Sequence, residues 1–384
     1  MSGKRLSDKI KSNFRTWIEI DYRAAKKNYK IFRKLVWPKI KIWSVVKSNA
    51  YGHGLTAFSR MVADAGVDGF CVDSVVEGLR LRREGIKKPI LVLGPTLLNR
   101  LGEAAVNDIA VSVSGIDSLK SLLHSKNQPH FHLKIDTGMH RQGIYLEDLS
   151  KVIKILNPRP HILNSRLTGI YTHFASAKDL NYPTYTDWQF QKFGKAVKLF
   201  ERAGFKNLVK HCAATGATLI DKKYHLDAVR LGIGLYGLWP SRELLAQLGG
   251  KIHLQPVLSW RTVVTEVKPL QEGDYVGYDL TERVRRPTKM AVLPVGYWHG
   301  YPRALSSIGE VLVSGQRAKV LGRVSMDLLT VDVTGLKCRP GDVATLLGSD
   351  GSEELCADEI AQKSGTTHYE FLTRLNPLIE RIVT

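Results

Sequence analysis

Short apolar runs separated by longer amphipathic segments fill the first two thirds of the chain. Eight runs read as strands, at residues 43–50, 69–73, 89–94, 109–115, 130–138, 167–174, 207–213 and 228–237. Amphipathic segments of helical length separate most of them, among them residues 55–65, 75–84, 118–125 and 187–203. Eight strands alternating with helices predict an α/β fold, a closed (β/α)8 TIM-type barrel of parallel strands. A doubly wound open sheet is the competing architecture, but no G-x-G-x-x-G turn follows the first strand.

Both ends of this pattern have a different character. Residues 1–13 read as a polar tail, residues 16–20 as a strand, and Asp21 as the N-cap of a helix that runs to about Leu35. After about residue 253 the helices largely disappear. Strands are predicted at residues 257–267, 289–295, 310–313, 318–321, 328–333 and 343–347, and helices at 353–364 and 370–375. We therefore expect a barrel domain over residues 14–250 and a smaller, mainly β domain over residues 251–384.

Composition is that of a soluble globular protein, with 43% hydrophobic and 24% charged residues. No apolar run has the length of a membrane span, and the N-terminal residues lack the apolar core of a signal peptide. The four cysteines are scattered without metal-type spacing and read as free thiols of a cytoplasmic protein. The formal net charge of +20 permits a nucleic-acid partner. Because the basic residues are dispersed and accompany no recognition motif, a generally basic surface is the simpler interpretation.

Lys47 ends the first apolar run, directly before a turn that contains Gly52 and Gly54. Desolvation at a strand end would favour the neutral amine, which can attack a carbonyl to form a Schiff base. Taken alone, such a lysine is more often a surface residue with only its alkyl stem buried.

The run at residues 130–138 alternates regularly, so His132, Lys134 and Asp136 share one face. We expect that face to point into the barrel, where polar side chains must be paired or functional. A metal site at His130 and His132 lacks a third ligand at suitable spacing, so no metal is predicted.

The string V-V-K-S-N-A-Y-G-H-G at residues 45–54 resembles the cofactor-lysine segment of the alanine racemase family, which consists of fold-type III pyridoxal-phosphate enzymes. Eight further segments resemble motifs of that family in the family's order. They are K-I-D-T-G-M-H-R (134–141), G-I-Y-T-H-F-A (169–175), H-C-A-A-T-G (211–216), V-R-L-G-I-G-L-Y-G (229–237), V-G-Y-D (276–279), P-V-G-Y (294–297), G-R-V-S-M-D (322–327) and G-T-T-H-Y-E (365–370).

The resemblance implies pyridoxal 5'-phosphate as the cofactor, attached to Lys47. The implied cofactor-binding residues are Lys47, Tyr51, His173, Thr215, Arg230, Gly232, Ile233 and Tyr369. Thr215 keeps a hydroxyl for the phosphate, and Gly232 and Ile233 would offer backbone N–H groups. Arg230 would face the pyridine nitrogen. Because arginine does not give up its proton, that nitrogen should remain unprotonated, which disfavours side reactions.

The resemblance also assigns residues to the substrate and to the second base. Arg141 and Met326 would lie at the substrate carboxylate, and Lys134, commonly carbamylated in the family, would orient Arg141. Tyr297 and Asp327 lie in supporting segments, Tyr297 at the active-site entrance.

Racemisation removes a Cα proton on one face and returns it on the other, which two opposed bases do most simply. The resemblance gives these roles to Lys47 and to Tyr278 of a second copy of the chain. His173, held by Arg230, would stabilise deprotonated Tyr278. A homodimer with shared active sites is therefore expected.

Three positions depart from the family pattern. Ala214 stands in place of asparagine, Asp279 in place of glycine and His299 in place of aspartate.

The predicted function is interconversion of L- and D-alanine, which supplies D-alanine for peptidoglycan. A related racemase for serine, lysine or a broad range of amino acids remains open because of Ala214. A fold-type III decarboxylase lacks support, since its C-terminal cysteine–aspartate signature is missing, and a non-catalytic cofactor-binding protein would lack the second domain.

Overall fold

The computed structural model describes residues 13–157 and 166–384, and these residues form two compact units. The barrel unit comprises residues 23–50 and 55–255. The β unit comprises residues up to Tyr22, the short segment 51–54, and residues 256–384. The expected polar tail falls almost entirely on residues 1–12, outside the described residues.

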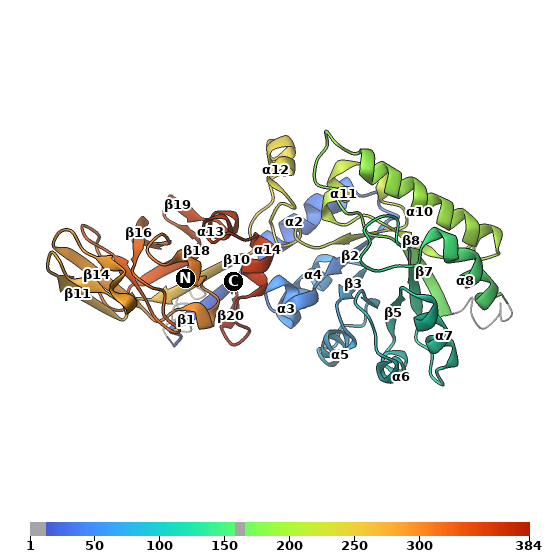
Figure 1. Ribbon diagram of the computed structural model, residues 1–384, viewed down its shortest axis with the longest axis horizontal. Coiled ribbons are helices and arrows are strands. Elements are labelled where there is room, and N and C mark those ends of the chain that lie inside the picture. Colours follow the sequence, from blue (N-terminus) through green and yellow to red (C-terminus); the bar gives the residue numbers. More distant parts are fainter. Residues whose placement is uncertain (1–12, 158–165) are drawn as a thin grey trace. The chain divides into compact units, whose positions relative to one another are not determined.

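Eight parallel strands form the wall of the barrel unit, as predicted (Figure 1). They are β2 (Lys41–Val45), β3 (Gly69–Val72), β4 (Ile90–Val92), β5 (Ile109–Val113), β6 (Phe131–Lys134), β7 (Leu167–Tyr171), β8 (Val209–His211) and β9 (Ala228–Leu231). Each strand pairs with the next along the chain up to β8, and β9 pairs with β2. The seam between β8 and β9 is joined by a bridge between Ala214 and Arg230. The barrel is thus nearly closed, and the open-sheet alternative is wrong.

Helices surround this wall. They are α2 (Tyr22–Leu35), α4 (Leu55–Ala65), α5 (Val75–Arg83), α6 (Leu98–Val106), α7 (Ile116–His124), α8 (Leu149–Leu156), α10 (Thr184–Arg202), α11 (Thr215–Ile220) and α12 (Arg242–Leu248). In α4 the buried residues Leu55, Phe58 and Val62 recur at helical spacing, which places one apolar stripe against the barrel.

The β unit contains one large, mostly antiparallel sheet. Its strands are β1 (Thr16–Ile20), β10 (Leu258–Val263), β11 (Glu266–Leu270), β14 (Thr288–Leu293), β15 (Glu310–Val313), β16 (Gln316–Leu321), β17 (Leu329–Asp332), β18 (Val343–Asp350), β19 (Glu353–Leu355) and β20 (Glu380–Val383). A separate hairpin joins β12 (Tyr275–Val276) to β13 (Glu282–Arg283), and the helices are α13 (Ala357–Lys363) and α14 (His368–Thr373).

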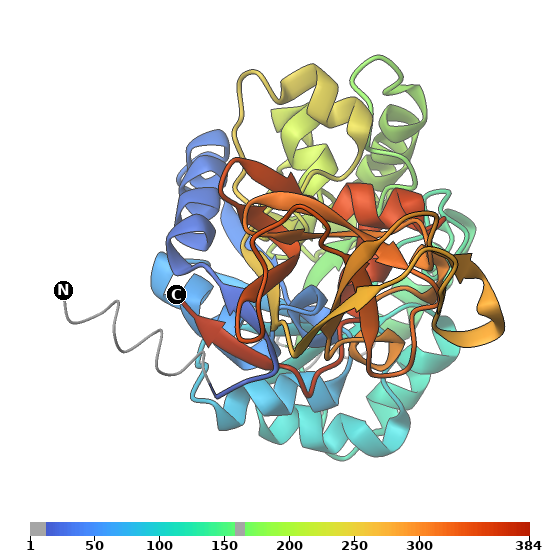
Figure 2. The ribbon, with the colours of Figure 1, turned by 90° about the vertical axis from the view of Figure 1, so that its left-hand side faces the viewer.

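The position of β1 corrects the sequence prediction. The sequence pattern predicts residues 16–20 as the start of the barrel domain, but β1 pairs with β10 on one side and with β20 on the other (Figure 2). Trp17 and Ile18 are buried there. The first strand of the chain therefore completes the sheet formed by the last third of the chain, which local sequence pattern cannot reveal.

Several elements of the β unit also differ from prediction. The strand expected at 257–267 is interrupted after Val263, and a second strand starts at Glu266. The helix expected at 353–364 begins only at Ala357, because Glu353–Leu355 pairs with β18 as β19. The final strand, β20, was not predicted.

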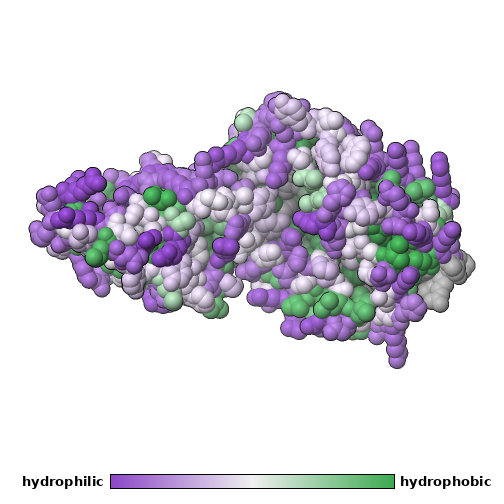
Figure 3. Space-filling view, in the orientation of Figure 1, coloured by the Kyte–Doolittle hydropathy of each residue, from purple (hydrophilic) through white to green (hydrophobic). Residues whose placement is uncertain are grey.

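Surface polarity is uneven. Hydrophobic residues interrupt an otherwise polar surface in several places (Figure 3). Within the described residues, no helix combines the length and apolar character needed to cross a membrane.

Candidate active site

The segment that follows β2 is a left-handed turn rather than the predicted continuation of the strand. Ser48, Asn49, Ala50 and Tyr51 have φ angles of 56°, 55°, 51° and 52°. For residues with a Cβ atom this conformation costs about 1–2 kcal/mol each relative to a right-handed turn. The strand prediction for residues 43–50 is therefore wrong beyond Val45, and Lys47 lies at the start of a strained turn labelled α3 (Lys47–Tyr51).

Three hydrogen bonds hold the turn. Glu77 Oε1 accepts from the Ser48 N–H at 2.7 Å, and the Asn49 side-chain oxygen accepts from the Leu55 N–H at 2.9 Å. The Ala50 N–H donates to the Val46 carbonyl at 2.8 Å. The turn is therefore fixed from both of its ends.

The amine of Lys47 lies 3.5 Å from an Asp73 carboxylate oxygen. The Lys47 side chain is 37% exposed and that of Asp73 is 53% exposed. The expected desolvation of Lys47 is thus not present. Sequence reasoning missed Asp73, although its place immediately after β3 puts it at the carboxyl end of a barrel strand, where active sites gather.

The polar face of β6 points into the barrel, as predicted. His132, Lys134 and Asp136 are all buried. Lys134 donates to the Gln142 side-chain oxygen at 2.9 Å, and Asp136 accepts from two backbone N–H groups of the following turn. Burial, together with the neighbouring cations Arg141, Arg230 and Lys47, lowers the pKa of Lys134 to about 8. Gln142, which sequence reasoning missed, is the first residue after the recognised motif.

Arg230 is the centre of the buried polar network. Its side chain is 2% exposed, and both terminal nitrogens are engaged. One donates to His211 Nδ1 at 2.6 Å and to the His211 carbonyl at 3.1 Å. The other donates to the carbonyls of Thr172 and Cys212 and lies 3.3 Å from His173 Nδ1. Within the described chain the Nε–H of Arg230 has no hydrogen bond and remains available to a ligand.

The histidines around Arg230 are neutral. Burial and the Arg230 charge lower the pKa of His173 and of His132 to about 3, and they hold the pKa of His211 well below its usual range. Because His211 Nδ1 accepts from Arg230, the His211 proton must be on Nε2. That nitrogen lies 2.8 Å from His132 Nδ1, which therefore accepts it. His211 lies within a motif that resembles the family, but the resemblance assigns no role to it.

A turn rich in glycine follows β9. The Thr215 hydroxyl oxygen accepts the N–H groups of Gly232 at 3.1 Å and Gly234 at 3.3 Å. The hydroxyl proton of Thr215 has no acceptor among the described residues. A Cβ atom on Gly234 would lie 2.5 Å from the Phe32 ring, so only glycine fits there. Ile233 lies between the two glycines. Thr215 and residues 232–234 together form a small cradle, the Thr215 cradle, in which the Thr215 hydroxyl can still donate a hydrogen bond.

In the β unit, Tyr278 lies at the tip of the β12–β13 hairpin and is 68% exposed. The next residue, Asp279, has a φ of 64°, a conformation in which glycine is favoured and aspartate is among the better tolerated alternatives. Its carboxylate lies 3.3 Å from the Arg323 Nε atom. The departure from glycine at this position therefore adds a carboxylate, which forms an ion pair between the hairpin tip and the segment that carries Met326.

The segments of Tyr297 and Met326 are joined by backbone hydrogen bonds. The Tyr297 N–H donates to Ser325 and the Trp298 N–H to Met326, each at 3.0 Å. Tyr297, Met326 and Asp327 are exposed. His299 accepts a hydrogen bond from the Gly296 N–H through Nδ1 at 3.2 Å, and partial burial lowers its pKa.

Tyr51 and Tyr369 lie together in the β unit, with ring centroids 6.2 Å apart. Burial raises the pKa of Tyr369, and Asp358 adds to that effect. Gly52 approaches so closely that a Cβ atom there would lie 2.0 Å from the Leu372 carbonyl oxygen. The end of the Lys47 turn is therefore packed within the β unit.

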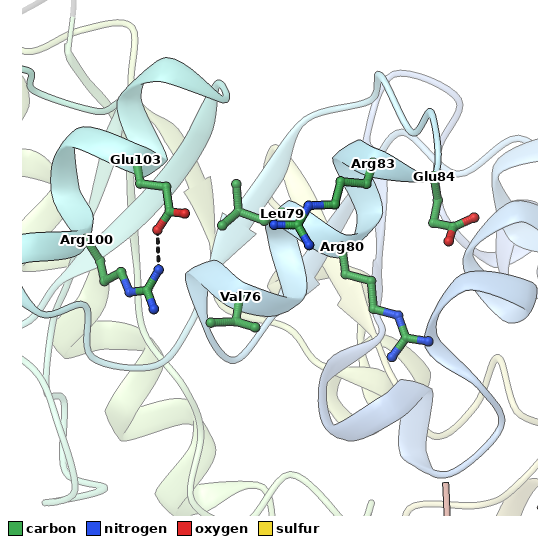
Figure 4. Close-up of a pocket in the computed structure, with 7 residues that line it drawn as sticks. All are labelled: Val76, Leu79, Arg80, Arg83, Glu84, Arg100 and Glu103. Atoms are coloured by element: carbon green, nitrogen blue, oxygen red, sulfur yellow. Dashed lines mark hydrogen bonds and ion pairs between the residues drawn. The ribbon is translucent and has the colours of Figure 1, made fainter. Parts of the chain in front are cut away.

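A groove of about 460 Å³ lies between α5 and α6 and contains none of these residues (Figure 4). It is lined by Val76, Leu79, Arg80, Arg83, Glu84, Arg100 and Glu103. In the part of the chain described, no group of three or more His, Cys, Asp or Glu side chains is arranged to hold a metal ion.

The chain matches two family profiles in succession. Residues 20–240 match "Alanine racemase, N-terminal domain", and residues 257–383 match "Alanine racemase, C-terminal domain". Proteins named alanine racemase from Leptospira interrogans and Methanococcus maripaludis are 36% and 37% identical. The first alignment covers 98% of each chain, and the second covers 95% of this chain and 98% of the relative.

Solved structures agree with these matches. The crystal structure of alanine racemase from Bacillus anthracis with bound L-Ala-P superposes with a TM-score of 0.89 at 34% identity, covering 96% of this chain and 95% of that one. Alanine racemase from Streptomyces lavendulae gives 0.86 at 32% identity, covering 96% and 97%.

Proposed function

The chain belongs to the alanine racemase family, and on that premise we propose that it interconverts L-alanine and D-alanine. We propose pyridoxal 5'-phosphate, bound through Lys47, as its cofactor. The arrangement around Arg230 carries this proposal. Among the described residues, both terminal nitrogens of the buried guanidinium donate hydrogen bonds and the Nε–H has no acceptor, and Lys47 and the Thr215 cradle belong to the same barrel unit.

The donor set fits the cofactor. The Arg230 Nε–H can donate to a ring nitrogen that carries no proton, because arginine remains charged at neutral pH even where burial lowers its pKa. The free hydroxyl proton of Thr215 and the N–H of Ile233 suit a phosphate. Tyr51 and Tyr369 are candidates for further cofactor contacts.

When bound, the cofactor withdraws electrons from the Cα–H bond of an attached amino acid and so acidifies it. Lys47 would take or return that proton on one face. Tyr278 of a second copy would do so on the other face, with neutral His173 as the hydrogen-bonding partner that stabilises deprotonated Tyr278. Arg141 and Met326 would contact the substrate carboxylate, and Lys134, as a free amine or a carbamate, would orient Arg141.

A homodimer would bring the two bases together. Seven large hydrophobic side chains are exposed on the Tyr278 hairpin and on the two segments that the Asp279–Arg323 ion pair and the backbone hydrogen bonds connect to it. They are Tyr275, Tyr278, Leu280, Tyr297, Trp298, Met326 and Leu328. Exposed apolar residues at this density are typical of a surface that another molecule covers.

The setting we propose is the cytoplasm, with D-alanine used for peptidoglycan. All four cysteines are unpaired thiols, which supports a reducing compartment.

Chiral analysis of the product from purified protein and L-alanine tests the function. We expect D-alanine to accumulate until both enantiomers are equal. Lys47→Ala should abolish this and should also lose borohydride-fixed cofactor at that position, whereas the exposed Lys151→Ala should be unaffected. Unchanged racemisation by Lys47→Ala would refute the assignment, and faster turnover of serine or lysine than of alanine would shift it to the related racemases.

A further inference from the structure

Glu77, on the first turn of α5, accepts hydrogen bonds from the backbone N–H of Ser48, which follows Lys47, and from that of Asp73, whose carboxylate pairs with Lys47. We propose that Glu77 is a positioning residue for the reaction, holding the strained turn that directs the Lys47 amine. This inference rests on the proposed function and adds a residue that none of the recognised motifs contains.

Both carboxylate oxygens of Glu77 are engaged outside their own helix. Oε1 accepts from the Ser48 N–H at 2.7 Å, and Oε2 accepts from the Asp73 N–H at 2.8 Å. Hydrogen bonds donated to a charged acceptor at these distances are roughly twice as strong as those between neutral groups. A single side chain thus fixes the residue after Lys47 and the backbone of the residue whose carboxylate pairs with Lys47.

The left-handed turn needs such an external acceptor. Residues 48–51 all have positive φ angles, although none of them is glycine. Conformations of this kind persist only where surrounding structure enforces them. Glu77 supplies the bond at Ser48, the first of the four residues, where the chain leaves the direction of β2.

An ordinary capping role does not account for these contacts. Ser74 is the N-cap of α5, and its hydroxyl accepts from the Glu77 N–H at 3.4 Å. In a capping box the glutamate would bond the N–H of Ser74 itself. Glu77 instead reaches the preceding residue, Asp73, and a separate strand–turn segment at Ser48.

Glu77→Gln is the sharpest test, because the amide keeps the size of the side chain but offers only one acceptor oxygen. In cofactor-free protein, we expect amide exchange in the peptide covering residues 47–51 to become about 10- to 100-fold faster. The matched control is Glu84→Gln at the other end of α5, whose carboxylate pairs with Arg60. It should leave exchange in that peptide unchanged.

In the holoenzyme, Glu77→Gln should lower kcat about 10- to 100-fold with little change in KM, as expected for a misplaced reacting group. The isotope effect of α-deuterated substrate should rise in the direction of racemisation in which Lys47 removes the Cα proton. It should stay unchanged in the opposite direction. A merely destabilised enzyme would show no such asymmetry.

A second substitution supplies a rescue. Ser48 is exposed and has a φ of 56°, so Ser48→Gly should relieve strain at no packing cost. In the Glu77→Gln background it should restore part of kcat. Normal exchange at residues 47–51 and a symmetric isotope effect in Glu77→Gln would overturn the inference. Absence of racemisation in the unmodified protein would instead refute the proposed function.

Discussion

Close contacts between individual residues determine how side chains pack inside the barrel. His132 lies directly against Gly169 of the neighbouring strand, and a Cβ atom on Gly169 would be 2.4 Å from His132 Nδ1. That nitrogen accepts the hydrogen bond from His211 on which the orientation of Arg230 depends. A glycine on β7 is therefore part of the support of the candidate site.

We expect Gly169→Ala to destabilise the protein by about 1–3 kcal/mol, because the buried imidazole cannot move without losing its hydrogen bond. Urea denaturation measures this. Gly194 in α10 is the control, since nothing lies within 4 Å of a Cβ atom there. Gly194→Ala should stabilise by about 0.5–1 kcal/mol. Equal effects of the two substitutions would contradict the packing argument.

Lys134 should make stability depend on pH. Its pKa in the folded protein is about 8, against a usual value of 10.5, so the unfolded chain binds more protons between these pH values. The free energy of unfolding therefore rises with pH through that window. Below pH 8 the folded protein bears the full cost of burying a protonated lysine.

In buffers freed of carbon dioxide, the free energy of unfolding of the unmodified protein should rise relative to Lys134→Met by about 2 kcal/mol between pH 8 and 9.5. Parallel pH profiles for the two proteins would show that the lysine is not desolvated as described.

At the scale of elements, strand order in the β unit depends on residues far apart in the chain. Ile18 of β1 is fully buried and is paired with Trp260 on one side and with Arg381 on the other. The β unit therefore requires a strand that precedes the whole barrel in sequence.

Ile18→Ala should destabilise the β unit by about 2–5 kcal/mol through the cavity that it leaves. Hydrogen exchange should accelerate in β10 and β20 and stay unchanged in β4 and β5. The opposite distribution would indicate that β1 belongs to the barrel.

At the scale of the whole molecule, the proposed site needs two copies of the chain. Lys47 and Tyr278 would come from different subunits, so each proposed dimer contains two sites that share both chains.

Mixing two inactive variants tests this arrangement. Lys47→Ala and Tyr278→Ala, unfolded and refolded together, should recover about a quarter of the unmodified activity, because half of the dimers are hybrids with one intact site. Each variant refolded alone is the control. If the mixture stays inactive although hybrid dimers form, the two bases do not meet across subunits.

The amino-acid sequence by itself determined the barrel, the family and most candidate residues. Strands and helices alternate with distinct hydrophobic periods, and short motifs keep their order along the chain. The inward face of β6 also followed from period-two alternation, since only local geometry is involved.

Only the tertiary structure decided the turn at Lys47, the place of β1 and the surroundings of Arg230. Ser48 is held left-handed by Glu77, 29 positions away, and β1 meets β20 across almost the whole chain. Arg230 depends on acceptors from two other segments, at Thr172 and at His211–Cys212. The local sequence pattern indicates which secondary structure each segment favours. These three features instead depend on contacts with residues that are distant in the sequence and become neighbours only in the folded chain.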